Sequence, residues 1–184
     1  MLLFLLPSLF LTIVNKIKID NFNQLIETRE KARLELIRNT ATAQIDEIIS
    51  DIQIIAKSET LNSFINSRKP REDKVYVAKE FVTMSKRKGR YDQIRFLSTS
   101  GKEVVRVDYN NGDPAIIPQF KLQNKSDRYY FKDTIKLKPE HVYSSPLDLN
   151  IENGKIEVPY KPMIRIGTNV YQDSNKKGVI LVNY

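Results

Sequence analysis

A long segment without a helix-breaking residue is the feature that most constrains this chain. Between Asp20 and Ile65 there is neither glycine nor proline, and apolar residues recur at steps of three or four, the period of an α-helix. In its second half they are Leu34, Ile37, Ala41, Ile45, Ile48, Ile52 and Ile55. A helix of about 40 residues far exceeds the globular average of ~11–12. We therefore expect one long helix whose second half packs on a folded domain; two ordinary helices joined by a loop are the alternative.

The N-terminus carries a second strong signal. Residues 1–14 contain no charge, which is typical of a targeting or membrane segment, although a bilayer-spanning helix needs roughly 20 residues. The segment is either a membrane anchor whose upstream end is missing or a buried helix that Pro7 begins or bends. We favour the anchor. The expected organisation is an anchor over 1–18, a stalk helix over 19–57 and a globular module over 58–184.

The composition excludes many kinds of functional site. The 184 residues include no cysteine and a single histidine, His141, so disulfides and multi-histidine or thiolate metal sites are excluded. No GxGxxG or GxxxxGK[ST] string occurs. We expect no catalytic residue, no metal and no cofactor. A hydrolase using Asp108 or Asp148 is the rival interpretation, but no nucleophile–base spacing supports it.

The chain is basic, with 30 lysine and arginine residues against 22 acidic ones. Such a balance suits a nucleic acid, an anionic membrane surface or an acidic ligand. The basic residues are spread along the chain, and the tight cluster is Lys86, Arg87, Lys88 and Arg90. A basic nucleic-acid-binding domain is an alternative function, but the uncharged N-terminus argues against it. We expect no nucleic-acid partner.

Sheet-forming patterns follow the helical part. A helix over 72–86 with Gly89 as its C-cap precedes them, and Ser126 is expected to cap a short helix over 127–137. Alternating apolar residues and turn signals predict strands at 91–98, 103–109, 141–145, 163–171 and 178–184, and a hairpin with Asn153-Gly154 at its turn. The expected fold class is α+β, an antiparallel sheet flanked by helices.

Several of these segments resemble a known family. The strings are RFLSTSGKEVVRVDY, KSDRYYFKDTIKL, SPLDLNIENGKIEVPYKPMIR and KKGVILVNY. They are similar to Cache (PAS-like, PDC) domains, the extracytoplasmic sensor modules of bacterial histidine kinases, diguanylate cyclases and chemoreceptors. The resemblance covers roughly residues 58 to 184. It implies a curved antiparallel sheet of about five strands with the long helix packed on its back.

The resemblance also implies a function. The module would sense a small molecule for a transmembrane receptor of the inner membrane, with its globular part periplasmic or extracellular. It would be the membrane-distal module of a tandem, and the output kinase or cyclase domain would lie outside this chain. A short isolated helix needs a partner, so we expect a homodimer through Phe22, Leu25 and Ile26. A structural or interaction module without a ligand is the alternative.

The resemblance places a ligand pocket between the sheet and the helix and loop that precede its central strands. On this sequence the pocket residues are Arg128, Tyr130, Tyr143, Ser145, Asp148 and Arg165. Arginine can hold a carboxylate, tyrosine offers a flat wall with a hydroxyl, and aspartate can take an ammonium group. The family's amino-acid-binding motif has tyrosine where this chain has Gln123, so the expected ligand is an unknown small molecule. Structural alternatives are an Asx turn at Asp148 and an Arg165–Glu157 pair.

Overall fold

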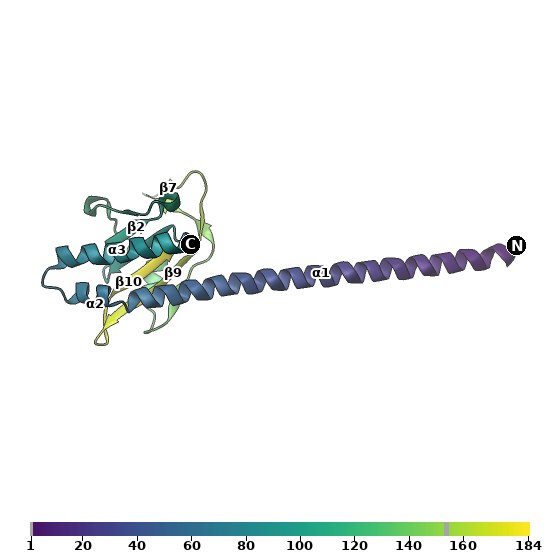
Figure 1. The fold of residues 1–184 in the computed structure, drawn as a ribbon, viewed down its shortest axis with the longest axis horizontal. Helices are drawn as coiled ribbons and strands as arrows, with labels where there is room; N and C mark the ends of the chain where they lie inside the picture. The colour runs from purple at the N-terminus through teal and green to yellow at the C-terminus, as the bar shows by residue number, and fades with distance from the viewer. Residues whose placement is uncertain (1, 153–154) are drawn as a thin grey trace. The chain divides into compact units, whose positions relative to one another are not determined.

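The computed structural model describes residues 2–152 and 155–184 (Figure 1). The chain divides into two compact units, Met1–Asp46 and Glu47–Tyr184. Helix α1 (Leu2–Ala56) runs through the first unit and contributes its last residues to the second. The sheet and the candidate site belong to the second unit.

The apolar stripe of α1 packs over a shorter length than the sequence predicts. Leu34 and Ile37 are exposed, and the buried positions begin at Ile48 and continue to Ala56. The prediction of packing from Leu34 onward is therefore wrong in its first part. A periodic stripe tells which face of a helix is apolar, but not how far along the helix its packing partner extends. Over the part of the chain that the structure describes, no helix combines the length and the apolarity that crossing a bilayer requires.

The long helix also ends earlier than the absence of glycine and proline predicts. It stops at Ala56, and α2 (Glu59–Asn66) begins after Ser58. Ser58 has an extended backbone, and its hydroxyl accepts a hydrogen bond from the Leu61 N–H at 3.2 Å. A serine N-cap of this kind stabilises a new helix start. The break therefore depends on a capping residue rather than on a helix breaker.

Helix α3 (Pro70–Lys88) ends where the sequence predicts. Gly89 takes the left-handed conformation, with a φ of 64°, and its N–H bonds back to the carbonyl of Ser85. Glycine adopts this conformation at little steric cost, which is why it terminates helices.

The second unit is built on a six-stranded antiparallel sheet of order β3-β2-β1-β10-β9-β4. The α+β class is confirmed. Its strands are β1 (Gln93–Ser98), β2 (Glu103–Asp108), β3 (Ala115–Ile116), β4 (Val142–Ser144), β9 (Arg165–Gln172) and β10 (Asn175–Asn183). Between the predicted strands 163–171 and 178–184 the chain makes a tight turn, because Asp173 and Ser174 take positive φ values and β10 already starts at Asn175.

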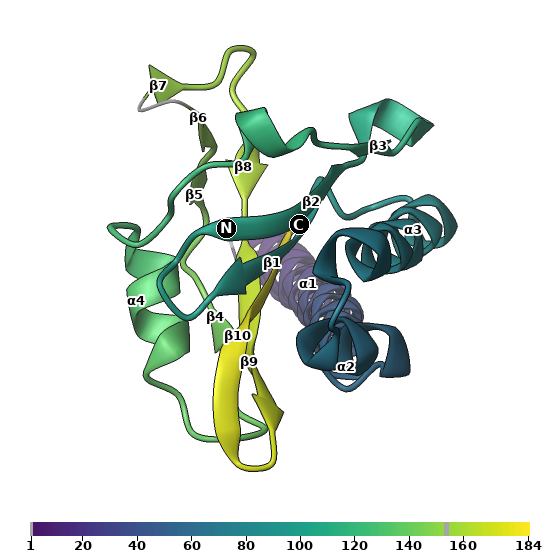
Figure 2. The same cartoon turned by 90° about the vertical axis from the view of Figure 1, so that its left-hand side faces the viewer.

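The two faces of the sheet carry different residues. On the helix-covered face, Ile94 and Phe96 of β1 are buried, and the Phe96 ring meets Phe64 of α2 edge-on with centroids 6.2 Å apart. On the opposite face, helix α4 (Tyr129–Ile135) supplies Tyr130 and Phe131 to a smaller apolar cluster. Figure 2 shows α2 and α3 on one side of the sheet and α4 on the other.

Helix α4 is shorter than predicted, and Ser126 does not cap it. The chain before it is tied to the β1–β2 turn, because the Lys125 N–H donates to the Gly101 carbonyl at 2.8 Å. Ser126 itself approaches Gly101 so closely that a side chain at this glycine would clash with its backbone. Tertiary contacts of this segment therefore delay the helix start to Tyr129.

Two segments border the face that α4 only partly covers. The first, which we call the strap, is residues 117–123 and contains the short helix η2 (Gln119–Lys121); it follows η1 (Asn110–Gly112) and β3. The second, the arm, is residues 148–152 and 155–163. Its strands form two small pairs, β5 (Asp148–Leu149) with β8 (Pro162–Met163) and β6 (Ile151–Glu152) with β7 (Lys155–Ile156). The predicted turn at Asn153-Gly154 lies outside the described residues.

Candidate functional site

Buried polar side chains occupy the α4 side of the sheet. The strand register sets Arg95 opposite Arg106, and Gln93 between Asp108 and Asn183. All but Asp108 are almost fully buried. Burying amides and guanidinium groups in the centre of a sheet costs free energy unless each group is satisfied. Such a concentration is therefore the first indication of a site.

Tyr130 is the centre of one group of these residues. Its ring is 2% exposed and lies within 5.1 Å of the Arg165 guanidinium carbon and 5.6 Å of those of Arg95 and Arg128. Cations are attracted to the face of an aromatic ring. We call Tyr130 and these three arginines the Tyr130 cluster. Burial raises the pKa of the Tyr130 hydroxyl, but Arg95 and Lys125 outweigh it, so the net shift is downward.

Carboxylates and amides compensate the arginines of the cluster. Arg165 pairs with Asp148 and donates to the Asn150 carbonyl oxygen at 3.2 Å. Arg95 donates to Asn183, and its Nη1 lies 3.6 Å from Oε1 of the buried Glu103. Among the described residues, Arg95 Nε and Glu103 Oε1 have no hydrogen-bond partner. One buried donor and one buried acceptor thus retain capacity to bind a further group.

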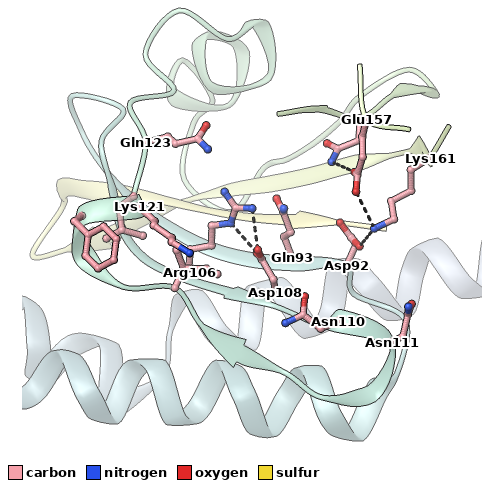
Figure 3. A pocket seen from close by; sticks show the side chains of 14 residues that line it. Asp92, Gln93, Arg106, Asp108, Asn110, Asn111, Lys121, Gln123, Glu157 and Lys161 are labelled. Atoms are coloured by element: carbon pink, nitrogen blue, oxygen red, sulfur yellow. Dashed lines mark hydrogen bonds and ion pairs between the residues drawn. The ribbon is translucent and has the colours of Figure 1, made fainter. Parts of the chain in front are cut away.

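An open cleft of about 810 Å³ lies on the same face, between the sheet, the strap and the arm (Figure 3). Its volume is within the range of small-molecule sites, ~300–1,000 Å³. The residues that line it are Asp92, Gln93, Arg106, Asp108, Asn110, Asn111, Ile117, Phe120, Lys121, Leu122, Gln123, Asn150, Glu157 and Lys161.

Ion pairs hold the walls of the cleft together. Arg106 forms a bidentate pair with Asp108, at 2.7 and 2.9 Å. Lys161 of the arm reaches Asp92 at 2.7 Å, and this carboxylate raises the pKa of the lysine. The amide of Asn150 donates to Glu157 at 2.8 Å. Since Asn150 also accepts from Arg165, it joins the cleft to the Tyr130 cluster.

One edge of the cleft is connected to α1. Tyr91 precedes the cleft residue Asp92, is fully buried and donates to Asp51 of α1. Burial, followed by the hydrogen bond to Asp51, raises the pKa of Tyr91. Lys88 pairs with Asp51 at 2.8 Å and with Glu47 at 2.9 Å. The hydrogen bond from Arg90, followed by that from Lys88, lowers the pKa of Glu47 to about 2. Two members of the basic cluster noted in the sequence are thus paired with acids of this helix.

The structure brings the six predicted pocket residues to one region. Arg128, Tyr130 and Arg165 belong to the Tyr130 cluster, and Tyr143 packs against the apolar group that includes Tyr130. The Ser145 hydroxyl accepts from the Arg165 backbone N–H at 2.8 Å. Asp148 pairs with Arg165, so the expected Arg165–Glu157 alternative is wrong. Of the described residues, those that line the open cleft are a different set from these six.

Sequence reasoning missed Gln93, Arg95 and Arg106, and considered Asp108 only as a hydrolase residue. Arg106 already binds Asp108 with both carboxylate oxygens. In the sequence these polar residues alternate with apolar ones, which is also the pattern of a strand with one solvated face. A detectable signal was the pairing of two arginines and two acids within neighbouring predicted strands.

Comparison with known proteins gives a consistent family assignment. Residues 24–184 match the family model described as bacterial histidine kinase, sensor domain. A search of curated proteins finds no match.

Solved structures share the fold. The extracellular domain of vpHK1S-Z8, a protein classed as a histidine kinase, is 25% identical with a TM-score of 0.69, covering 79% of this chain and 50% of that one. The sensor domain of the V. cholerae histidine kinase DctB is 15% identical with a TM-score of 0.64, covering 87% and 56%. The sensory domain of the Campylobacter jejuni chemoreceptor Tlp3, solved with isoleucine, is 13% identical with a TM-score of 0.52, covering 82% and 52%. The chain spans about half the length of these domains.

Proposed function

The chain belongs to the family of bacterial histidine kinase sensor domains, and from this premise we propose that it binds a small molecule outside the cytoplasm for a transmembrane receptor. A sensor domain is not itself catalytic. The kinase or cyclase activity would belong to an output domain elsewhere in the receptor. The observation that carries the proposal is the cleft of about 810 Å³, lined in part by the buried polar residues Gln93 and Arg106 of the sheet.

We assign the Tyr130 cluster to the inner wall of this binding site. Arg128 and Tyr130 would contact the ligand, while Tyr143, Ser145 and Asp148 would position Arg165. Two facts support this assignment: Asn150 bonds to both Arg165 and the cleft residue Glu157, and Arg106 of the cleft lies 4.0 Å from the Glu103 carboxylate that faces Arg95. A ligand in the cleft would therefore act on both groups.

Thermal unfolding with a panel of amino acids, organic acids and sugars tests the proposal. A compound that binds only the folded chain raises the unfolding temperature, because its binding free energy, RT ln(1 + [L]/Kd), adds to stability. Replacing the half-buried Arg128 with alanine is expected to abolish the shift, whereas the control Lys132→Ala, an exposed change on the same helix α4, keeps it. If no compound raises the unfolding temperature, the chain is instead a structural or interaction module, which the internal pairing of Arg165 with Asp148 would favour.

The domain organisation and location form the second part of the proposal. We assign residues 1–18 to a membrane anchor, 19–57 to a stalk and 58–184 to the sensor module, with the module in the periplasm or outside the cell. Apolar residues such as Phe10 and Leu11 are exposed, which a lipid environment would cover. Protease added to spheroplasts should degrade the module. Degradation only after lysis would contradict this location.

The stalk is the proposed path of the signal and the proposed dimer contact. Phe22, Leu25 and Ile26 are exposed, so these apolar side chains are available to a second copy of the helix. Single cysteines at these three positions should cross-link in membranes of the complete receptor, with a helical period. Failure at all three would contradict the dimer.

A further inference from the structure

The charges that line the cleft cancel. Its acidic residues are Asp92, Asp108 and Glu157, and its basic residues are Arg106, Lys121 and Lys161. Two of the acids are already held by short pairs, Asp108 by Arg106 and Asp92 by Lys161, both at 2.7 Å. An ionic ligand would have to break one of these pairs or enter without a counter-charge. Either event carries a desolvation cost.

The uncharged part of the cleft lining is rich in amide side chains. Amide side chains from several separate segments reach the cleft, among them Gln93, Asn111, Gln123 and Asn150. Each amide carries both donors and acceptors. Together with the paired carboxylates and guanidinium groups, they present closely spaced donors and acceptors with no net charge. In Figure 3, Gln93, Arg106 and Asp108 extend from the sheet, and Glu157 and Lys161 lie on the arm side.

One exposed aromatic residue completes the lining. Phe120, on the strap, lines the cleft and is 83% exposed. The ring is therefore accessible to a molecule bound in the cleft. Its flat face suits a flat, weakly apolar ligand surface such as the C–H face of a sugar ring.

We propose that the cleft binds a neutral polyhydroxylated molecule of the size of a mono- or disaccharide, which deepens the ligand-sensing function proposed above and rests on it. A hydroxyl group both donates and accepts, so it can join a carboxylate to an amide or guanidinium without displacing the ion pair. The C–H face of the ring stacks on Phe120. The volume of about 810 Å³ accommodates a molecule of this size.

Binding measurements on the purified full chain separate this ligand class from charged ones. The probes are D-glucose, D-galactose, maltose and myo-inositol on one side, and L-serine, L-isoleucine and succinate on the other. At least one neutral probe is expected to raise the unfolding temperature. Its dissociation constant by calorimetry should change less than twofold between about 0.05 and 0.5 M NaCl, because a neutral ligand has no charge to screen.

Two variants place the bound molecule in the cleft. Phe120→Ala should weaken binding of the neutral probe by about three- to tenfold through loss of the stacking surface. The control is Tyr76→Ala, which removes another exposed aromatic residue, on α3 and outside the cleft lining, and should leave the dissociation constant unchanged. Both positions are exposed, so neither change should impair folding.

Other outcomes overturn the inference in distinguishable ways. If a charged probe binds and no neutral one does, the ligand class is wrong while ligand sensing stands. If no probe of either kind binds, both the proposed ligand class and the ligand-sensing function are contradicted. If a neutral probe binds equally well to the Phe120→Ala variant, it does not occupy the cleft as proposed, and the inference is again wrong.

Discussion

The two faces of the sheet are built from adjacent residues of the same strands but meet different demands. Ile94, Phe96 and Val107 face the helices and are buried among apolar side chains. Gln93, Arg95 and Arg106 are equally buried on the other face, yet they are polar and depend on specific partners. Apolar burial is non-directional, whereas a buried charge must be matched atom by atom. The first face therefore contributes stability, and the second carries the residues that we propose for ligand recognition.

Truncating the helix-covered face tests its share of the stability most directly. Ile94→Ala removes a fully buried side chain and should lower the free energy of unfolding by about 2–5 kcal/mol. Urea unfolding followed by circular dichroism measures this change. Ile116→Ala, at an exposed isoleucine of β3, is the matched control and should stay within about 0.5 kcal/mol. Equal losses from the two variants would contradict the division between the faces.

Breaking one ion pair tests the polar face. Asp148→Ala leaves the buried Arg165 guanidinium without its carboxylate, with the Asn150 hydrogen bond and the Tyr130 ring contact remaining. It should cost about 1–3 kcal/mol, less than for a fully buried pair because Asp148 is one-third exposed. Adding Arg165→Met should recover part of this loss, since no unpaired charge remains. A double variant less stable than the single one would show that the pair itself contributes net stability.

A polar contact on the helix side sharpens the comparison. Tyr91→Phe removes the hydrogen bond to Asp51 and should cost about 1–2 kcal/mol. Because the folded-state pKa of Tyr91 is raised, its contribution is complete below the unfolded value of 10.0 and is lost as pH rises above it. The free energy of unfolding, measured with urea, should therefore fall with pH above about 10 more steeply for the wild-type chain than for the phenylalanine variant. Parallel profiles would contradict this assignment.

The smallest effect on stability is expected at Glu47, the exposed acid that shares Lys88 with Asp51. The pKa of Glu47 is lowered to about 2 from 4.5, so its stabilising contribution is present above pH 4.5 and is lost as pH falls toward 2. Glu47→Gln should flatten the loss of stability in that acid range. Because this residue is exposed to solvent, added salt should reduce the difference between the two chains. Arg38 pairs with Glu35 on an exposed part of α1, and the control Arg38→Gln should leave the acid-range profile unchanged.

The sequence predicts which helices and strands form better than it predicts where their packing against one another begins and ends. Gly89 and the alternation in β1 and β2 depend on local geometry, and those predictions are confirmed. Helix α1 ends at Ala56, one residue before the end of the predicted stalk, although glycine and proline are absent as far as Ile65. Ser58 breaks the helix through a cap, a signal weaker than proline or glycine. The exposure of Leu34 was missed because periodicity carries no information on where the partner surface ends.

The candidate site was predicted only in part, for a related reason. Tyr130 and Arg165 were found through the resemblance, and the structure places them within 5.1 Å of one another. Arg95 and Arg106 were missed, because alternating polar residues are also typical of a strand with one solvated face. Tyr130 of α4 lies against Arg95, and residues of the strap and the arm line the cleft beside Arg106. All of these segments lie outside β1 and β2 in the sequence. A pattern within one strand cannot reveal which distant segment covers it.

The position of β10 has a consequence for how the chain acquires its structure. Among the described strands this one comes latest in sequence, yet it lies between β1 and β9 in the sheet, and Gln93 pairs with Asn183, 90 positions later. Contacts of such long sequence separation slow folding, because the loop must close before they form. The β1–β2 hairpin and β9 cannot join until the final strand arrives between them. Synthesis therefore leaves two unconnected half-sheets with exposed edges until β10 has been made, and those edges are the places where misassembly between chains would begin.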